Sequence, residues 1–566
     1  MRGLEASEGI ELLRKLGVKG DEEELRTAVE HCSGHAFALT LLASLLYNRN
    51  LSLSTFFRDP MYRELWTGNI ARNLLDYIYQ QQLDASQRTL LRAFAVFREP
   101  VPVAAAATIM NGLAGPSTAQ THAALDALLA QNLLQASGEG HYQLHAIVAQ
   151  YALGHFVEGE EAANQAAVQA AHIKAAAYYR NLAGTISPAR GKRGHISDVE
   201  PLIEAIWHTC QAQQWQEAYR LMEQERLFSD LRNWGGYAIL LELYTLLLPP
   251  DKWQAELLQA AHIYNNLGVV YRSLGKMEQA RKYLEQALDI YEKEGDRVEE
   301  SWSLNHLGRV YSEIGNKEQA RLYYEQALQI CQEEGDRLGE AAALNNLGRV
   351  YGALEQKEQE QQYYQRALDI SREEGDRRGE AATLNNLGRV LDDLGQPDKA
   401  QASFEQALRI FREIGNIKGE SWALNNLGKI CSELGQQEQA RKYLEQALLL
   451  RREVDRRGVG RTLNNLGAVH VRLDQYEQAR ACYEEALRIN REVGDHEGEG
   501  KTLRNMGILA LAQRRYEAAL TSLLLARNTL DELQSPSRSG TQEWIDKIRQ
   551  AVGEEQFAAL LARVQI

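Results

Sequence analysis

The stretch Leu344-Asn345-Asn346-Leu347-Gly348 (LNNLG) decides the fold of this 566-residue chain, because close variants of it recur through the C-terminal half. The glycine that ends the block stands at seven positions: Gly268, Gly308, Gly348, Gly388, Gly428, Gly467 and Gly507. Successive glycines are 40 residues apart, except that Gly428 and Gly467 are 39 apart. A fixed period of this length is typical of repeat proteins, in which each unit packs on its neighbours.

Each unit is expected to fold as two helices, each with an apolar stripe at helical spacing. In the second repeat these stripes comprise Leu304, Leu307, Gly308 and Tyr311, and then Ala320, Tyr324, Ala327 and Leu328. A glycine inside a helix costs about 1 kcal/mol relative to alanine, so Gly308 is expected to permit close approach of the next helix. Gly315 and Gly335 are expected to end the two helices, and Asp336 to cap the following one.

This pattern of Leu307-Gly308, Tyr311, Ala320, Tyr324 and Ala327 resembles the tetratricopeptide repeat. The 40-residue period and the GDR linkers, as at residues 295–297, resemble the long repeats of spindle-orientation adaptors that bind G-protein α subunits. The LNNL block is similar to that of kinesin light chain. The resemblance covers residues 251–535 and implies an all-α fold, an α-solenoid superhelix of about seven repeats.

Two units depart from the pattern. Glu355 replaces the turn glycine and Glu360 the packing alanine, which predicts a softer joint in the array. The linker at residues 455–458 (DRRG) is one residue shorter, which predicts a shift in superhelical register.

A candidate binding surface lies beside the packing stripe. Asn305 and Arg309 are four residues apart and therefore share one helix face. The equivalent residues are Asn265, Asn345, Asn385, Asn425 and Asn464, with Arg349, Arg389 and Lys429 as the cations. The family resemblance implies that these positions line the concave surface. Trp302 and Trp422, one turn before Asn305 and Asn425, are candidates for the groove entrance.

This surface suits an extended acidic peptide. Asparagine amides both donate and accept hydrogen bonds, and arginines bind carboxylates through paired donors. We therefore predict that residues 300–470 hold an acidic, extended segment of a protein partner. In the alternative, the asparagines bridge neighbouring helices, the cations pair with nearby acids and the tryptophans pack between repeats. The second asparagine column favours bridging more strongly: Asn266, Asn346, Asn386, Asn426 and Asn465.

Residues 1–66 are expected to form short helices at 7–16, 22–32 and 36–47. Residues 30–39 (EHCSGHAFAL) resemble the end of an NB-ARC nucleotide-switch module, where the family has GLPLAL. His35, Ala36 and Phe37 replace the central Leu-Pro-Leu, and the family's proline is the residue that abuts the adenine. We interpret this segment as the remnant of an NB-ARC-like helical subdomain.

Residues 67–157 extend this resemblance. Helices are expected at 86–97, 122–134 and 146–156, with a strand at 141–145, an order similar to the winged-helix part of NB-ARC proteins. His145 stands in the family's Met-His-Asp motif, which implies a vestigial nucleotide-sensing role. The candidate recognition helix 122–134 offers few basic residues, so a packing role is favoured over DNA reading.

The remaining segments are expected to be helical. Residues 158–250 are predicted to be degenerate repeats that lead into the array, for example at 214–228 (QWQEAYRLMEQERLF). Residues 535–540 (SPSRSG) break the pattern, and the helices of 540–566 are predicted to cap the last exposed apolar face.

Composition narrows the function. The formal net charge of −14 argues against general binding to nucleic acid or an anionic membrane. The five cysteines form no disulfide framework or zinc motif, and neither an apolar run of about 18 residues nor a signal peptide occurs, which favours the cytoplasm. The motifs G-x-x-x-x-G-K-[ST], H-E-x-x-H and G-x-S-x-G are absent from the sequence. We therefore expect no enzyme, cofactor or metal.

Three hypotheses remain. The leading one is a protein- or peptide-binding scaffold without enzymatic activity, the sensor arm of a bacterial NB-ARC-type (STAND) signal-transducing regulator. A second is an ATP/ADP-dependent switch whose P-loop core lies upstream of this sequence, in which case an adenine nucleotide would bind there. A third is a winged-helix transcriptional regulator that binds DNA.

Overall fold

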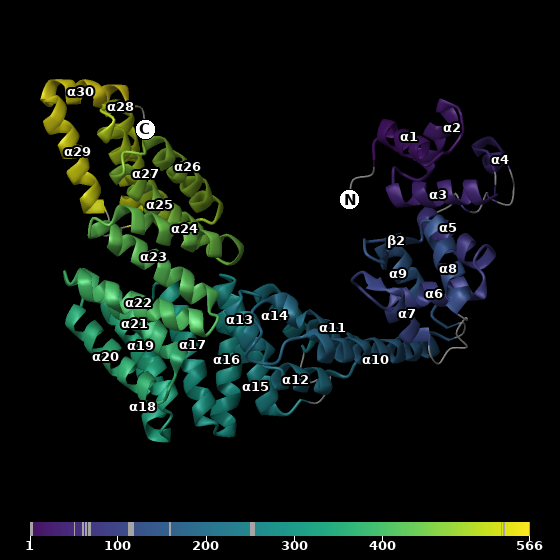
Figure 1. The fold of residues 1–566 in the computed structure, drawn as a ribbon, viewed down its shortest axis with the longest axis horizontal. Coiled ribbons are helices and arrows are strands. Elements are labelled where there is room, and N and C mark those ends of the chain that lie inside the picture. The colour runs from purple at the N-terminus through teal and green to yellow at the C-terminus, as the bar shows by residue number, and fades with distance from the viewer. Residues whose placement is uncertain are drawn as a thin grey trace. The chain divides into compact units, whose positions relative to one another are not determined.

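The computed structural model describes residues 4–49, 51–58, 62, 65, 69–110, 118–157, 160–248, 255–533, 535 and 538–564. The chain divides into two compact units. The first unit comprises Met1–Arg193 and Ser197–Glu225, and the second comprises Gly194–Ile196 and Arg226–Ile566. The boundary near residue 225 falls inside the segment expected to hold degenerate repeats. Figure 1 labels the elements of both units.

The first unit begins with the short helices that the sequence predicts. They are α1 (Ala6–Lys15), α2 (Glu22–His31), α3 (Ala36–Arg49) and α4 (Leu53–Arg58). The Asp21 carboxylate caps α2 by accepting from the Glu24 amide, and the Asp21 amide donates to the Glu24 carboxylate. Leu13, Leu25 and Leu39 are fully or almost fully buried where these helices meet.

Five helices and a small sheet follow. They are α5 (Ile70–Gln81), α6 (Ala85–Ala95), β1 (Val101–Pro102), α7 (Val103–Met110), α8 (Thr118–Ala130), β2 (Leu134–Ala136), β3 (His141–Leu144) and α9 (Ala146–Gly154). The sheet is antiparallel with the order β1-β3-β2, and Leu134 pairs with Leu144. The predicted helices and the strand at 141–145 are confirmed with small shifts. The sequence did not predict the strands β1 and β2, because two or three residues are too few to show the alternation of apolar and polar side chains that marks a strand.

The rest of the first unit is built on a long helix. It contains α10 (Glu161–Ile186), α11 (Glu200–Gln211) and α12 (Trp215–Gln224), with a 3-10 turn η2 (Ile196–Val199) before α11. The buried rings of His172 on α10 and His208 on α11 are joined by a 2.9 Å hydrogen bond between their Nδ1 atoms. Arg98 reaches across to the Glu204 carboxylate at 2.6 Å.

The second unit starts with α13 (Leu227–Asn233) and α14 (Tyr237–Leu246). Seven helix pairs follow: α15 (Leu257–Ser273) and α16 (Met277–Glu294), α17 (Arg297–Ile314) and α18 (Lys317–Glu334), α19 (Arg337–Ala353) and α20 (Lys357–Glu373), α21 (Arg377–Asp393) and α22 (Pro397–Glu413), α23 (Ile417–Glu433) and α24 (Gln437–Val454), α25 (Arg456–Arg472) and α26 (Tyr476–Glu492), α27 (His496–Ala512) and α28 (Tyr516–Glu532). These pairs confirm the predicted solenoid of about seven repeats (Figure 1).

The repeated glycine is explained by the contact between the two helices of a pair. A Cβ atom built on Gly308 would lie 2.6 Å from Cε1 of Tyr324, which is closer than real contacts allow. The expectation that this glycine permits close approach is therefore confirmed. Gly315 and Gly335 end their helices with φ angles of 95° and 72°, and the Asp336 side chain accepts a hydrogen bond from the Gly339 amide.

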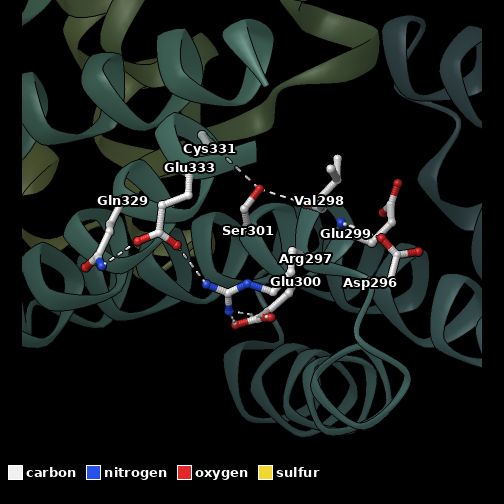
Figure 2. A network of polar contacts seen from close by, with 9 residues as sticks. All are labelled: Asp296, Arg297, Val298, Glu299, Glu300, Ser301, Gln329, Cys331 and Glu333. Atoms are coloured by element: carbon white, nitrogen blue, oxygen red, sulfur yellow. Dashed lines mark hydrogen bonds and ion pairs between the residues drawn. The ribbon is translucent and has the colours of Figure 1, made fainter. Parts of the chain in front are cut away.

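The GDR linker leads from one repeat to the next, and its arginine ties together the two helices of the repeat that follows, as Figure 2 shows for α17 and α18. The Asp296 carboxylate caps α17 by accepting from the Glu299 amide at 3.3 Å. Arg297 places one guanidinium nitrogen 2.9 Å from Glu300 on its own helix and another 3.2 Å from Glu333 of α18. Equivalent arginines bridge the corresponding acids in the next two joints: Arg337 with Glu340 and Glu373, and Arg377 with Glu380 and Glu413.

A buried arginine, Arg451, packs beside the shortened linker and makes hydrogen bonds to α25. Arg451 is 2% exposed and donates to the Gly458 carbonyl at 2.9 Å and to the Thr462 hydroxyl at 2.8 Å. Burial lowers the pKa of Arg451 to about 10. Asp455 caps α25 as the aspartate of the other linkers does, and the residue that is lost is the glycine before it. The predicted shift in superhelical register at this joint stays a prediction.

Two helices close the array. They are α29 (Arg538–Val552) and α30 (Glu554–Arg563), and they pack on α28. Ile545, Ile548 and Phe557 bury their side chains with Leu520 and Leu523. The last apolar face is therefore covered by the segment that was expected to cap it.

Candidate binding site

The two asparagine columns join neighbouring repeats. In five joints, the second asparagine of one repeat donates its amide to the first-column asparagine of the repeat before it. The first four of these bonds are Asn346 to Asn305 (3.3 Å), Asn386 to Asn345 (3.1 Å), Asn426 to Asn385 (3.0 Å) and Asn465 to Asn425 (3.2 Å). Arg504 stands in the first column of the last repeat, where Asn505 continues the ladder to Asn464 at 3.1 Å. Asn265 instead accepts from Ser303 at 3.3 Å.

This ladder is largely internal to the array. Asn265, Asn305 and Asn425 are 6%, 2% and 4% exposed. Their amide oxygens are already used by protein donors, so the arrangement corresponds to the bridging alternative. Peptide binding by this column stays a prediction.

The basic stripe divides into two halves. Arg389 lies 3.0 Å from the buried Glu360 carboxylate, and Lys429 lies 2.7 Å from Asp392. These two cations are therefore matched by acids of the array itself. Arg349 contacts only a neutral group in the described structure, the Tyr324 hydroxyl at 3.3 Å, and Arg309 has a buried Nε atom with no hydrogen-bond partner among the described residues.

Arg309 and Arg349 line a cavity of about 450 Å³ within the second unit. The cavity is bordered by α13, α14, α15, α17, α19, α21, the end of α22 and α23. Its cationic lining residues are Arg232, Arg272, Arg309, Arg349, Arg378 and Lys418. Glu313 is the one carboxylate among the described lining residues, and it pairs with Arg272 at 2.6 Å. The lining therefore carries a net charge of about +5 at neutral pH.

The crowding of positive charges lowers the pKa values of several side chains that line the cavity. Repulsion from Arg272, together with burial, lowers the pKa of Arg309 to about 9. Burial and the neighbouring Arg378 lower the pKa of Arg232 to about 10. Burial and Arg309 hold the pKa of His306 well below its usual range, so that ring is neutral at pH 7. An anion in the cavity would relieve this repulsion.

One wall of the cavity comes from outside the seven repeats. The Lys418 ammonium lies 5.6 Å from the centre of the Tyr237 ring on α14 and 5.5 Å from the Trp422 ring on its own helix. Asn416 caps α23 beside it by accepting from the Gly419 amide. The turn between α13 and α14 therefore faces repeats that lie about 180 residues further along the chain.

Sequence reasoning placed Arg309, Arg349 and Trp422 in the site, and the structure brings these three together. Trp302 lies on α17, half-buried, outside this lining. Sequence reasoning missed Arg232, Tyr237, Arg272, Arg378, Lys418 and His306. One signal was available: His306 is the residue that interrupts the second asparagine column, where LNHLG replaces LNNLG.

His145 serves the local structure of the first unit. Its Nδ1 atom accepts from the Ile147 amide at 3.3 Å and so caps α9. Its ring stacks on Phe37 with centroids 4.1 Å apart and planes 3° from parallel. Burial, followed by His35, lowers its pKa. The vestigial nucleotide-sensing role stays a prediction.

Across the described part of the chain, no helix is long and apolar enough to cross a membrane. In the same residues, no group of three or more His, Cys, Asp or Glu side chains is placed to hold a metal ion. The five cysteines are free, and burial raises the pKa of Cys32 and of Cys210 to about 12.

Comparison with known families identifies the repeats. The family described as Tetratricopeptide repeat matches residues 259–333, 323–373, 361–413, 379–453 and 458–531. Residues 259–531 therefore form a tetratricopeptide-repeat array, as the sequence resemblance implied. The second unit is thus a scaffold of the protein-interaction class. A search of curated proteins finds no match to this chain.

Several solved structures are similar at low identity. A Signal Transduction ATPase with Numerous Domains protein with a tetratricopeptide repeat sensor, from Pyrococcus horikoshii, is 17% identical with a TM-score of 0.48, over 94% of this chain and 74% of that one. Aspartyl phosphate phosphatase F from Bacillus subtilis is 15% identical with a TM-score of 0.40, over 59% and 94%. A putative kinesin light chain with tetratricopeptide-like repeats from Podosopora anserina is 21% identical with a TM-score of 0.27, over 34% and 96%.

Proposed function

We propose that the chain is the sensor arm of an NB-ARC-type regulator, and that its array binds an acidic, extended segment of a protein partner. The observation that carries the proposal is the cavity with six cations and one carboxylate, in a chain whose formal net charge is −14. Electrostatic attraction of this kind draws an acidic partner to one surface and disfavours binding elsewhere.

The contacts of the basic stripe narrow the binding surface. Arg389 and Lys429 already have carboxylate partners, so they offer less to an incoming acid than the stripe suggested from sequence. Among the described residues, no carboxylate pairs with Arg309 or Arg349. We therefore centre the surface on α17 and α19, beside the cavity.

The first unit supports the switch-protein part of the proposal. Its element order of helix, strand, two helices and two strands, from α6 to β3, is that of a winged helix. The helix α8, in the recognition position, contains neither lysine nor arginine and carries Asp126. This favours a packing role in a regulator over DNA binding, in keeping with the resemblance of residues 30–39 and His145 to NB-ARC proteins.

Binding of fluorescent acidic peptides, measured by anisotropy on a degenerate library rich in Asp and Glu, tests the proposal. Arg309→Glu with Arg349→Glu should weaken binding at least about tenfold, because both free cations become repulsive. Lys282→Glu with Arg409→Glu makes the same change of charge on exposed positions of α16 and α22, and should leave binding unchanged. Equal binding by both double variants would contradict the proposed surface.

A further inference from the structure

We propose, resting on the proposed function, that the cavity seats a phosphorylated side chain of the acidic segment. The ligand class is therefore a phosphopeptide, in which the phosphate enters the cavity and flanking carboxylates meet Arg309 and Arg349 at its edge.

The first argument is charge density. The lining carries about +5 in about 450 Å³. A carboxylate brings one negative charge, whereas a phosphorylated side chain brings about −1.5 to −2 on one compact group. A single phosphate with about three flanking carboxylates would balance the lining. Carboxylates alone would require about five acidic side chains to converge on the same small volume.

The second argument is the number of unused donors. The Nε atoms of Arg232, Arg272 and Arg309 are buried and have no hydrogen-bond partner among the described residues, and the same holds for His306 Nδ1. A buried polar group without a partner costs free energy, so such a cluster indicates a ligand that supplies acceptors. A phosphate offers three acceptor oxygens at one point, and arginines bind them in pairs.

The third argument is where the cations come from. Arg378 is the second residue of α21 and Lys418 the second residue of α23, so both helices begin at the cavity. The amino-terminal ends of helices carry partial positive charge, which adds to the side-chain charges. Arg232 comes from α13, and burial together with repulsion from Arg378 lowers the pKa of Arg232. Six helices each contribute one of these cations to the lining, so several donors from different elements can bind the oxygens of one tetrahedral anion.

Arg378 and Lys418 allow a specific test because neither belongs to the stripe of Arg309 and Arg349. Three degenerate nonapeptide libraries, rich in Asp and Glu, are fixed at the centre as phosphoserine, serine or glutamate. They are presented to the full chain, and binding is measured by anisotropy. Pyrophosphate alone is titrated in a fourth arm by calorimetry.

We expect the phosphoserine library to bind at least about tenfold more tightly than the serine and glutamate libraries. The reason is that the phosphate accepts additional charge-assisted hydrogen bonds from the cations of the cavity. Arg378→Gln with Lys418→Gln should remove most of this preference, so that the phosphoserine and glutamate libraries bind the double variant within about threefold of each other. Circular dichroism verifies that this double variant is folded. Lys282→Gln with Arg409→Gln serves as the control and should keep the preference.

Each other outcome has one meaning. Equal binding of the three libraries would overturn the phosphate site and leave the acidic-segment proposal standing. Binding of pyrophosphate but of no library would overturn both, and would assign the cavity to a small phosphate compound. A preference that survives Arg378→Gln with Lys418→Gln would place the phosphate elsewhere and overturn the inference.

Discussion

The guanidinium of Arg389 lies 3.0 Å from a carboxylate oxygen of Glu360, whose side chain is fully buried at the position where other repeats have alanine. Lys357 contacts the other oxygen at 3.2 Å. Gly352 makes room for this carboxylate, since a Cβ atom there would collide with it. A residue that looks like part of a ligand-binding stripe therefore holds an internal charge in place.

Removal of this cation should destabilise the array. Arg389→Ala leaves the buried carboxylate with Lys357 alone, so we expect a loss of about 1–3 kcal/mol in unfolding free energy. Glu360→Ala with Arg389→Ala restores the alanine of other repeats and should recover most of that loss. Hydrogen exchange of α20 and α21 measures both variants. An Arg389→Ala array as stable as the parent would mean that the pair contributes nothing.

The asparagine ladder gives a second prediction. Asn425 accepts from both Thr462 and Asn465, at 3.1 and 3.2 Å, and is almost fully buried. Asn425→Ala removes the acceptor of the Asn465 amide, whereas the Thr462 hydroxyl keeps the Gly458 carbonyl at 3.0 Å as an acceptor. The substitution should therefore cost about 1–3 kcal/mol, while peptide binding by the remaining fraction of folded protein stays the same. Thermal unfolding and the anisotropy assay separate these effects. Loss of binding with unchanged stability would instead assign this asparagine to the ligand.

Two helix glycines should respond in opposite ways to alanine. Gly308→Ala pushes a methyl group into Tyr324 and should cost about 1–3 kcal/mol through overpacking. Gly184 lies in α10, where an added Cβ would meet nothing within 4 Å. Gly184→Ala should therefore gain up to about 1 kcal/mol from helix propensity. Exchange rates of α17 and α10 report the two changes, and equal responses would refute the packing explanation.

Acid should destabilise the first unit through two buried histidines. Burial lowers the pKa of His172 to about 4, and burial with repulsion from His172 lowers that of His208 to about 2. Both rings are neutral in the folded unit, while in the unfolded chain they take up protons below about pH 6.5. Above that pH they cost nothing, and as the pH falls toward 4 each lowers stability by about 1.4 kcal/mol per pH unit.

The measurement is hydrogen exchange of α10 and α11 between pH 7 and pH 4, corrected for intrinsic rates. His208→Phe keeps a ring next to Tyr179 and removes one of the two titrating groups, so the slope should fall to about half. A slope unchanged by this substitution would show that other groups control the acid sensitivity.

The repeat fold was predictable because the same pattern of apolar residues and glycines recurs in each repeat. The spacing of LNNLG and of the turn glycines predicted the helix pairs and the ends of their helices. The second half of the site was not predictable in the same way. Arg378 and Lys418 reach Arg309 only through the pitch of the superhelix, and Arg232 comes from α13, before the first repeat. Pitch depends on the sum of many small packing rotations, and sequence spacing does not contain it.

The sequence also did not predict which partner each repeated polar side chain contacts. Asn345 and Arg389 have the same neighbours in sequence whether they face a ligand or the next repeat. The choice is made by residues about 30 to 40 positions away, namely Asn386 and Glu360. A periodic sequence shows that such contacts recur but not which of two faces receives them.

The asparagine ladder also bears on how such a chain can change over evolutionary time. Each rung joins a donor and an acceptor that most repeats carry, so a duplicated block of 40 residues brings both halves of the rung with it. The 39-residue interval keeps its rung as well, from Asn465 to Asn425, because the lost residue lies in the linker. Units can thus be copied or deleted by recombination without redesign of the joints. His306 stands where the other repeats have the donor asparagine of a rung. A duplicated copy of any other repeat would therefore place an asparagine, and not this histidine, at the cavity.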